Sequence, residues 1–258
     1  MSDSRVLSFR EVAPRLGDAA ISSVMVAVLI TGIGWFLVWE AVWQPQHLVA
    51  GMIGFGILAS IVNFHWAIHQ PSARFGEANQ VTLLRSGLVC LIGSSLIAGG
   101  QAPEITWYLV GLMAVALALD AVDGFLARRL RLSSTFGARF DMEIDALLLL
   151  ILSLLVWQTE QAGAWVLAIG LMRYVFVAAS WFLPSLNAPL DPSWRRKCVC
   201  ALQGIALFAC LLPPLDQTKA SAIAALALVT LTISFGLDIK ALLLRETSIA
   251  TTDNGRAS

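Results

Sequence analysis

The chain has 258 residues, of which 58% are hydrophobic and only 13% are charged. A soluble domain of this size could not cover so much apolar surface, so this composition excludes a soluble globular protein. We therefore expect an all-α, polytopic integral membrane protein in contact with membrane lipid. The formal net charge is zero, and we expect no nucleic-acid partner.

About 20 consecutive apolar residues are needed to cross a bilayer as a helix. Eight segments meet this requirement: residues 19–41, 48–68, 80–98, 105–127, 138–157, 162–183, 197–213 and 218–240. The first is too long for the apolar part of a signal peptide and lacks a small-residue cleavage site, so we expect it to be retained. The sequence thus predicts about eight transmembrane helices.

The two ends of the chain are polar. Residues 1–18 are expected to form a basic arm, either an amphipathic helix on the membrane surface or a solvated segment. Residues 244–258 are expected to form a loose tail. An even number of spans places both termini on one side, and the arginines of the N-terminal arm make that side cytoplasmic. We expect the inner (cell) membrane of a bacterium.

Four aspartates interrupt two neighbouring apolar segments. Asp120 and Asp123 share one helix face, and Asp141 and Asp145 share a face of the next helix. These helices run antiparallel, and both Asp120 and Asp145 lie about 12 Å from the basic loop that joins them. The spacing predicts that the four carboxylates converge in the cytoplasmic half of the membrane, which is where the active site is expected.

Four ionised carboxylates in one place repel by several kcal/mol. Protonation, basic partners or divalent cations could each relieve the repulsion, but Arg128 and Arg139 lie too near the loop to serve all four carboxylates. Ligand sets made only of oxygen favour hard cations, so Mg²⁺, or Mn²⁺ as a substitute, fits best. Two such ions would balance the four charges and could hold a phosphate group between them.

Small residues lie on the same two faces, and they leave room either for close helix packing or for a bulky ligand beside the carboxylates. They are Gly124, Ala127 and Gly137. Beside four aspartates, a ligand cavity is the favoured interpretation.

These residues together resemble the signature of the CDP-alcohol phosphotransferase family, also called CDP-alcohol phosphatidyltransferases. The matching positions are Asp120, Asp123, Gly124, Ala127, Arg128, Gly137, Asp141 and Asp145. Residues 78–85 also resemble the segment that opens the first helix of the family core, with Ala78 in place of the usual proline. The resemblance implies a six-helix catalytic core at residues 78–243. Two additional helices in residues 19–70 then have no family role.

The resemblance implies an enzyme of phospholipid biosynthesis that moves a substituted phosphate from a CDP-linked donor to an alcohol hydroxyl and releases CMP. Asp120, Asp123, Asp141 and Asp145 would ligate two divalent metal ions, Mg²⁺ or Mn²⁺, and Asp145 would be either the general base or only a ligand. Residues expected to contact or lie near the cytidine diphosphate are Asn79, Thr82, Arg85, Gly124, Ala127, Arg128 and Gly137. CDP-diacylglycerol is the expected donor, on family prevalence.

The acceptor is left open, because the residues after Gly137 match neither the family pattern for glycerophosphate nor that for serine or choline. An alcohol or a phosphorylated alcohol is therefore expected. Many members of the family form homodimers, and the residues themselves do not decide this.

Further basic residues could form an anion pocket for a phosphorylated acceptor or the donor. They are Arg173, Arg195, Arg196 and Lys197. For the last three the alternative is ordinary anchoring by positive charge at the cytoplasmic surface. For Arg173 the alternative is a salt bridge to Glu143 or Asp238. His65 and His69 have a metal-ligand spacing, but interfacial placement is favoured.

Two other functions are left open by the residues. A transporter or channel could use the acidic cluster to bind ions, but it would not need Arg128 and the small residues. A catalytically silent relative could bind a CDP-alcohol without turning it over.

Overall fold

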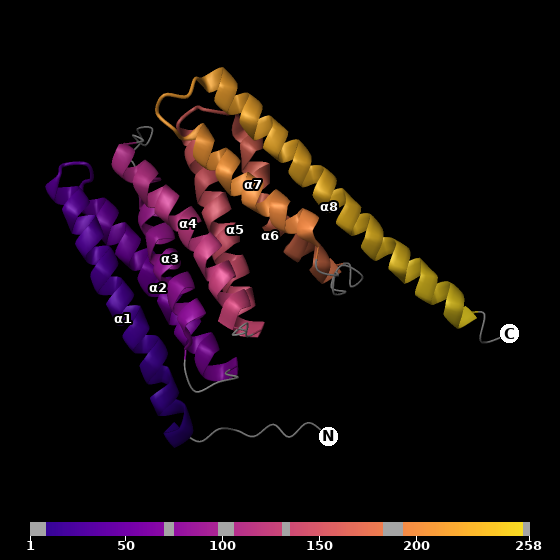
Figure 1. Cartoon of the computed structure of the whole chain (residues 1–258), viewed down its shortest axis with the longest axis horizontal. Coiled ribbons are helices and arrows are strands. Elements are labelled where there is room, and N and C mark those ends of the chain that lie inside the picture. The colour runs from indigo at the N-terminus through magenta and orange to yellow at the C-terminus, as the bar shows by residue number, and fades with distance from the viewer. Residues whose placement is uncertain (1–8, 70–74, 98–105, 131–134, 183–192, 255–258) are drawn as a thin grey trace. The chain divides into compact units, whose positions relative to one another are not determined.

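The computed structural model describes residues 9–69, 75–97, 106–130, 135–182 and 193–254. Within these ranges the chain forms eight α-helices and one 3-10 turn, with no strand (Figure 1). The helices are α1 (Phe9–Trp39), α2 (Pro45–His69), α3 (Glu77–Ser94), α4 (Trp107–Leu130), α5 (Thr135–Gln158), α6 (Leu167–Phe182), α7 (Trp194–Cys210) and α8 (Gln217–Asn254), with the turn η1 (Ala164–Val166) before α6.

Four stretches of helix in the described ranges are long and apolar enough to cross a membrane. They are Gly17–Trp39, Pro45–Ile68, Ala164–Phe182 and Gln217–Ala241. Large apolar side chains are exposed along them, for example Val28 on α1 and Ile57 on α2, as contact with lipid tails requires. The described part of the chain is therefore helical, as predicted, and its apolar helices agree with an integral membrane protein. A total of eight spans, six of them in a core, stays a prediction.

The two terminal helices extend beyond the segments that the hydropathy pattern predicts. α1 begins at Phe9, inside the expected arm, and α8 continues to Asn254, through most of the expected loose tail. Residues 241–246 include three leucines and no glycine or proline, so nothing in the sequence stops the helix before Gly255.

The chain divides into two compact units, Met1–Leu148 and Leu149–Ser258, and α5 crosses the boundary between them. In the first unit α1, α2 and α3 pack against one another, and α4 packs against α3 (Figure 1). Two glycines allow the close approach: a Cβ added to Gly51 of α2 would lie 2.9 Å from a Leu91 methyl of α3. One added to Gly87 of α3 would lie 2.8 Å from a methyl of Ile30 on α1.

The second unit contains the rest of α5 together with η1, α6, α7 and α8, and α7 packs along α8. Gln203 of α7 is fully buried and donates from Nε2 to the carbonyl oxygen of Ala227 on α8, at 3.1 Å. A hydrogen bond across two helices is a common stabilising device in membranes.

Gly170 of α6 lies against α5, and its replacement by alanine should destabilise the protein by about 1–3 kcal/mol. The added Cβ would lie 2.5 Å from the Cα atom of Leu150, and backbone cannot swing aside as a flexible side chain can. The thermal unfolding midpoint in detergent measures the loss. Gly236→Ala is the matched control, since Gly236 of α8 has nothing within 4 Å of its added Cβ; an equal loss in the control would contradict the prediction.

Candidate active site

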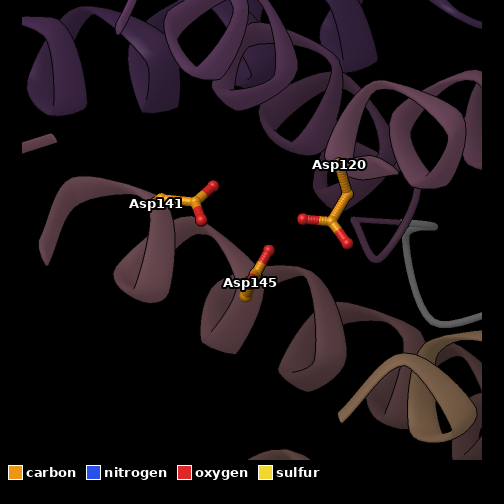
Figure 2. A group of neighbouring side chains, drawn as sticks. All are labelled: Asp120, Asp141 and Asp145. Carbon is orange, nitrogen blue, oxygen red and sulfur yellow. The ribbon is translucent and has the colours of Figure 1, made fainter. Parts of the chain in front are cut away.

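Three of the four predicted aspartates meet in the first unit. Asp120 lies on α4, while Asp141 and Asp145 lie one turn apart on α5. Figure 2 shows their carboxylates turned toward one another, and each offers an oxygen within 4.8 Å of the others. The predicted convergence of carboxylates from two antiparallel helices is therefore present for these three.

Arg85 of α3 lies at the centre of the three carboxylates. Its Nη1 donates to Oδ1 of Asp120 at 2.5 Å, and its Nη2 donates to Oδ1 of Asp141 at 2.6 Å and to Oδ1 of Asp145 at 2.8 Å. The planar guanidinium has five N–H donors in a fixed fork, so one side chain can bind carboxylates from two helices at once. Arg85 thus ties α3 to both α4 and α5.

The burial of the cluster is uneven. The Arg85 side chain is completely buried, whereas Asp120, Asp141 and Asp145 keep 38%, 34% and 26% of their side-chain surface exposed. A buried guanidinium needs paired and hydrogen-bonded partners, and the carboxylates supply them. The partly exposed side of each carboxylate stays accessible to a ligand that enters the site.

The residues present fit a hard divalent cation. Three carboxylates and one guanidinium carry a formal charge of −2, which one divalent ion would balance. The donors are all oxygen, and the spacing of at most 4.8 Å is close to the separation of about 4 Å between opposite ligands of octahedral Mg²⁺. Arg85 binds Oδ1 of each aspartate, and all three carboxylates stay partly exposed, so a metal ion can reach them.

Sequence reasoning missed this basic partner. Arg128 and Arg139 were considered because they are near the aspartates in sequence, and Arg139 is exposed in the structure. Arg85 was expected only near the cytidine diphosphate. One signal could have found it, because a single arginine inside the otherwise apolar segment 80–98 must pair with acidic groups.

The comparison with families of known proteins supplies the chemistry. A model of the CDP-alcohol phosphatidyltransferase family matches residues 76–234, more than half of the chain. The chain belongs to the CDP-alcohol phosphatidyltransferase family. It is therefore a transferase that moves a phosphatidyl-type group from a CDP-alcohol to an alcohol acceptor. Comparisons with curated proteins and with solved structures gave no significant match.

The matched segment of this transferase begins just before α3 and ends inside α8. It includes Arg85 and the three carboxylates that Arg85 binds. α1 and α2 lie outside the matched segment.

Asn79 and Thr82, expected near the cytidine diphosphate, are buried on α3. Asn79 donates from Nδ2 to the carbonyl oxygen of Phe75 at 2.5 Å, and Thr82 donates from Oγ1 to that of Ala78 at 3.1 Å. Both bonds are local to the start of α3. Gly137 is half-buried on α5, one turn before Asp141.

The remaining signature residues belong to α4. The structure describes their backbone as helical, but their side chains are outside its described part. They are Asp123, Gly124, Ala127 and Arg128. Their roles as metal ligand and nucleotide contacts stay predictions.

The basic residues at the start of α7 face a carboxylate of α8 in the second unit. Arg195 donates from Nη1 to the Ser234 carbonyl at 2.7 Å and from Nη2 to Asp238 Oδ1 at 2.5 Å, and Arg196 lies 3.4 Å from the same oxygen. Arg195 and Arg196 therefore join α7 to α8 and engage Asp238, the acid considered for Arg173. An additional role in an anion pocket stays a prediction.

The other basic candidates lie on α6 and on α7. Arg173 is half-buried on α6 and Lys197 is exposed on α7. His65 is exposed on α2, with Nδ1 3.0 Å from the carbonyl oxygen of Ile61, while the side chain of His69 is outside the described residues. The group of metal-ligand side chains found among the described residues does not include His65, and its interfacial placement stays a prediction.

Proposed function

We propose that the protein transfers a phosphatidyl group from CDP-diacylglycerol to the hydroxyl of an alcohol or phosphorylated alcohol and releases CMP, in phospholipid biosynthesis. The observation that carries this proposal is the meeting of Asp120, Asp141 and Asp145 at Arg85 in a chain of this family. Family membership favours this enzyme over a transporter or channel, since an ion path needs no CDP-alcohol domain.

Two divalent ions, Mg²⁺ or Mn²⁺, would be held by the described carboxylates together with Asp123. Bound there, they would neutralise charge on the diphosphate of the donor and so stabilise the transition state. The charge balance supports two divalent ions. With Asp123 included, four carboxylates and Arg85 carry −3, so two divalent ions leave +1, which an anionic diphosphate offsets.

Asp145 is the residue that we propose takes the proton of the acceptor. The hydroxyl oxygen of the acceptor would attack the phosphorus that carries the diacylglycerol, the bond from that phosphorus to the bridging oxygen would break, and CMP would leave with the bonding electrons. The acceptor proton would pass to the Asp145 carboxylate. Asp145 is the least exposed of the three carboxylates, and its hydrogen bond from Arg85 fixes its position in the cluster.

The proposed membrane arrangement follows the charge pattern. Eight helices would cross the inner membrane of a bacterium, with both termini and the active site on the cytoplasmic side. The catalytic core would occupy residues 78–243, preceded by two additional helices in 19–70, and the protein would work as a homodimer in contact with membrane lipid.

Purified protein in detergent, incubated with labelled CDP-diacylglycerol, Mg²⁺ or Mn²⁺ and a panel of alcohols, tests the proposal. The panel contains glycerol phosphate, inositol phosphate, serine and choline. We expect CMP release that depends on one acceptor and on the divalent ion, and that stops with EDTA. If no acceptor yields CMP while the protein still binds the CDP-alcohol, the silent-relative interpretation replaces the proposal.

A further inference from the structure

The second helix reaches the site through one buried aromatic residue. Trp66, near the end of α2, is only 1% exposed. Its ring lies edge-to-face against Phe75, which precedes α3, with centroids 5.2 Å apart, and against Phe136 at the start of α5, with centroids 5.3 Å apart. A single side chain of α2 thus bridges the entry to α3 and the first turn of α5.

The aromatic contacts adjoin the catalytic residues on α5. Phe136 directly precedes Gly137, and Phe140, whose ring centroid is 6.1 Å from that of Phe136, directly precedes Asp141. Successive residues of a helix project about 100° apart. The aromatic face of α5 is therefore next to the face that carries Asp141 and Asp145, and a shift of one face moves the other.

α1 and α2, which form a helical hairpin, also hold α3 in place. Gly51 of α2 lies against the backbone of α3 at Leu91, and Gly87 of α3 lies against Ile30 of α1. Gly87 is two residues after Arg85, whose guanidinium binds all three carboxylates. Close packing of this kind resists small displacements, because interiors have few voids to absorb them. α1 and α2 thus fix α3, and Trp66 fixes the start of α5.

We propose that the hairpin α1–α2, which lies outside the family-matched segment, is a positioning element of the active site, with Trp66 as its main contact. It sets the spacing between α3, which brings Arg85, and α5, which brings Asp141 and Asp145, at which the carboxylates bind a divalent cation. This inference rests on the proposed function for the presence of the metal. It assigns to the two additional helices the role of positioning the metal ligands.

The side-chain chemistry of Trp66 supports a role in shape. Its buried Nε1 has no hydrogen-bond partner within the described residues, and a buried unsatisfied donor costs about 1–3 kcal/mol. The Nε1 atom therefore contributes no stabilising hydrogen bond here, and Trp66 acts through the ring contacts with Phe75 and Phe136. Phenylalanine offers a similar ring without the donor, so Trp66→Phe should keep the contacts with Phe75 and Phe136.

Trp66→Ala should weaken the binding of Mn²⁺, measured by calorimetry without any substrate, by about tenfold or more, as loss of outer-shell support does in other metal sites. Trp66→Phe should stay within about threefold of the wild type. The matched control is Phe55→Ala. Phe55 is 2% exposed on the same helix, but it lies about 16 Å from Trp66 along the helix axis. Both alanine variants should lose stability, and only Trp66→Ala should lose metal affinity.

Phe136→Leu provides a second variant on the α5 side of the same contact, should Trp66→Ala fail to fold. It keeps an apolar side chain and should weaken Mn²⁺ binding by about threefold to tenfold. Equal Mn²⁺ affinity in the wild type, Trp66→Ala and Phe136→Leu would overturn the inference alone, and so would an equal loss in Phe55→Ala. A wild type that binds no Mn²⁺ would overturn the proposed metal site together with the inference.

Discussion

Replacing Asp145 with alanine is expected to reduce the rate of CMP release by about 10³-fold or more. The substitution removes a general base, which contributes about 10²–10⁴-fold to a rate, and also a metal ligand. It further removes one of the three carboxylates that Arg85 binds, at 2.8 Å. The rate is measured as labelled CMP released from CDP-diacylglycerol with the best acceptor, at saturating Mg²⁺.

Asp120→Asn separates the two contributions. Its carboxamide keeps the size of the side chain and can still accept a hydrogen bond from Arg85, but it loses the charge that a divalent ion needs. We expect turnover to fall to background here too, with partial recovery at high Mg²⁺, whereas Asp145→Ala should not recover. Full recovery of Asp145→Ala would show that Asp145 is a ligand and not the base.

Glu143→Gln is the matched control for both variants. Glu143 lies between Asp141 and Asp145 in the sequence but is exposed on another face of α5. Its replacement removes one acidic charge from a face of the same helix that does not carry Asp141 and Asp145, so activity should remain within about twofold of the wild type, because surface substitutions have small effects. If Asp145→Ala is as active as Glu143→Gln, the proposed site is wrong.

The spacing of the aspartates was enough to predict that the carboxylates of Asp120, Asp141 and Asp145 meet. Asp141 and Asp145 are four residues apart, which places them on one helix face whatever the tertiary structure. Asp120 required one more inference, that the two apolar helices run antiparallel and so bring equal depths together. Both inferences concern local geometry and the length of a membrane helix, and these are properties that a sequence states directly.

The partners of these aspartates were beyond such reasoning. Arg85 is 35 residues before Asp120 and 60 before Asp145, and its placement depends on how α3 packs against α4 and α5. Trp66 is still less visible, since its role follows from contacts with Phe75 and Phe136 and not from any motif. The ends of α1 and α8 in the structure also differ from the predicted ends. Apolar patterning marks where lipid contact stops and not where backbone hydrogen bonding stops.

Replacing Arg85 with methionine is expected to destabilise the metal-free protein by about 2–3 kcal/mol. Methionine fills a similar volume, so the variant isolates the loss of the charge and its hydrogen bonds. Removal of one partner of a fully buried ion pair costs about 3–5 kcal/mol. The three carboxylates keep 26–38% of their surface exposed, so water relieves part of their repulsion and the expected loss is at or below the lower end of that range.

The thermal unfolding midpoint in detergent, measured with EDTA and again with Mg²⁺, checks this prediction. Since three carboxylates without Arg85 carry −3 instead of −2, Mg²⁺ should raise the midpoint of Arg85→Met more than that of the wild type. Arg85→Lys should give an intermediate result, because an ammonium group is a point charge and cannot span carboxylates of two helices as the guanidinium does.

Arg139→Met tests whether any positive charge near the aspartates stabilises the metal-free protein. Arg139 is two residues before Asp141 on α5 and is exposed, so it should change the EDTA midpoint by less than the equivalent of about 0.5 kcal/mol. Arg85→Met with the same EDTA midpoint as Arg139→Met would mean that Arg85 does not organise the cluster. A lower midpoint for Arg85→Met that Mg²⁺ restores would mean that a buried guanidinium holds the metal ligands together until the ion binds.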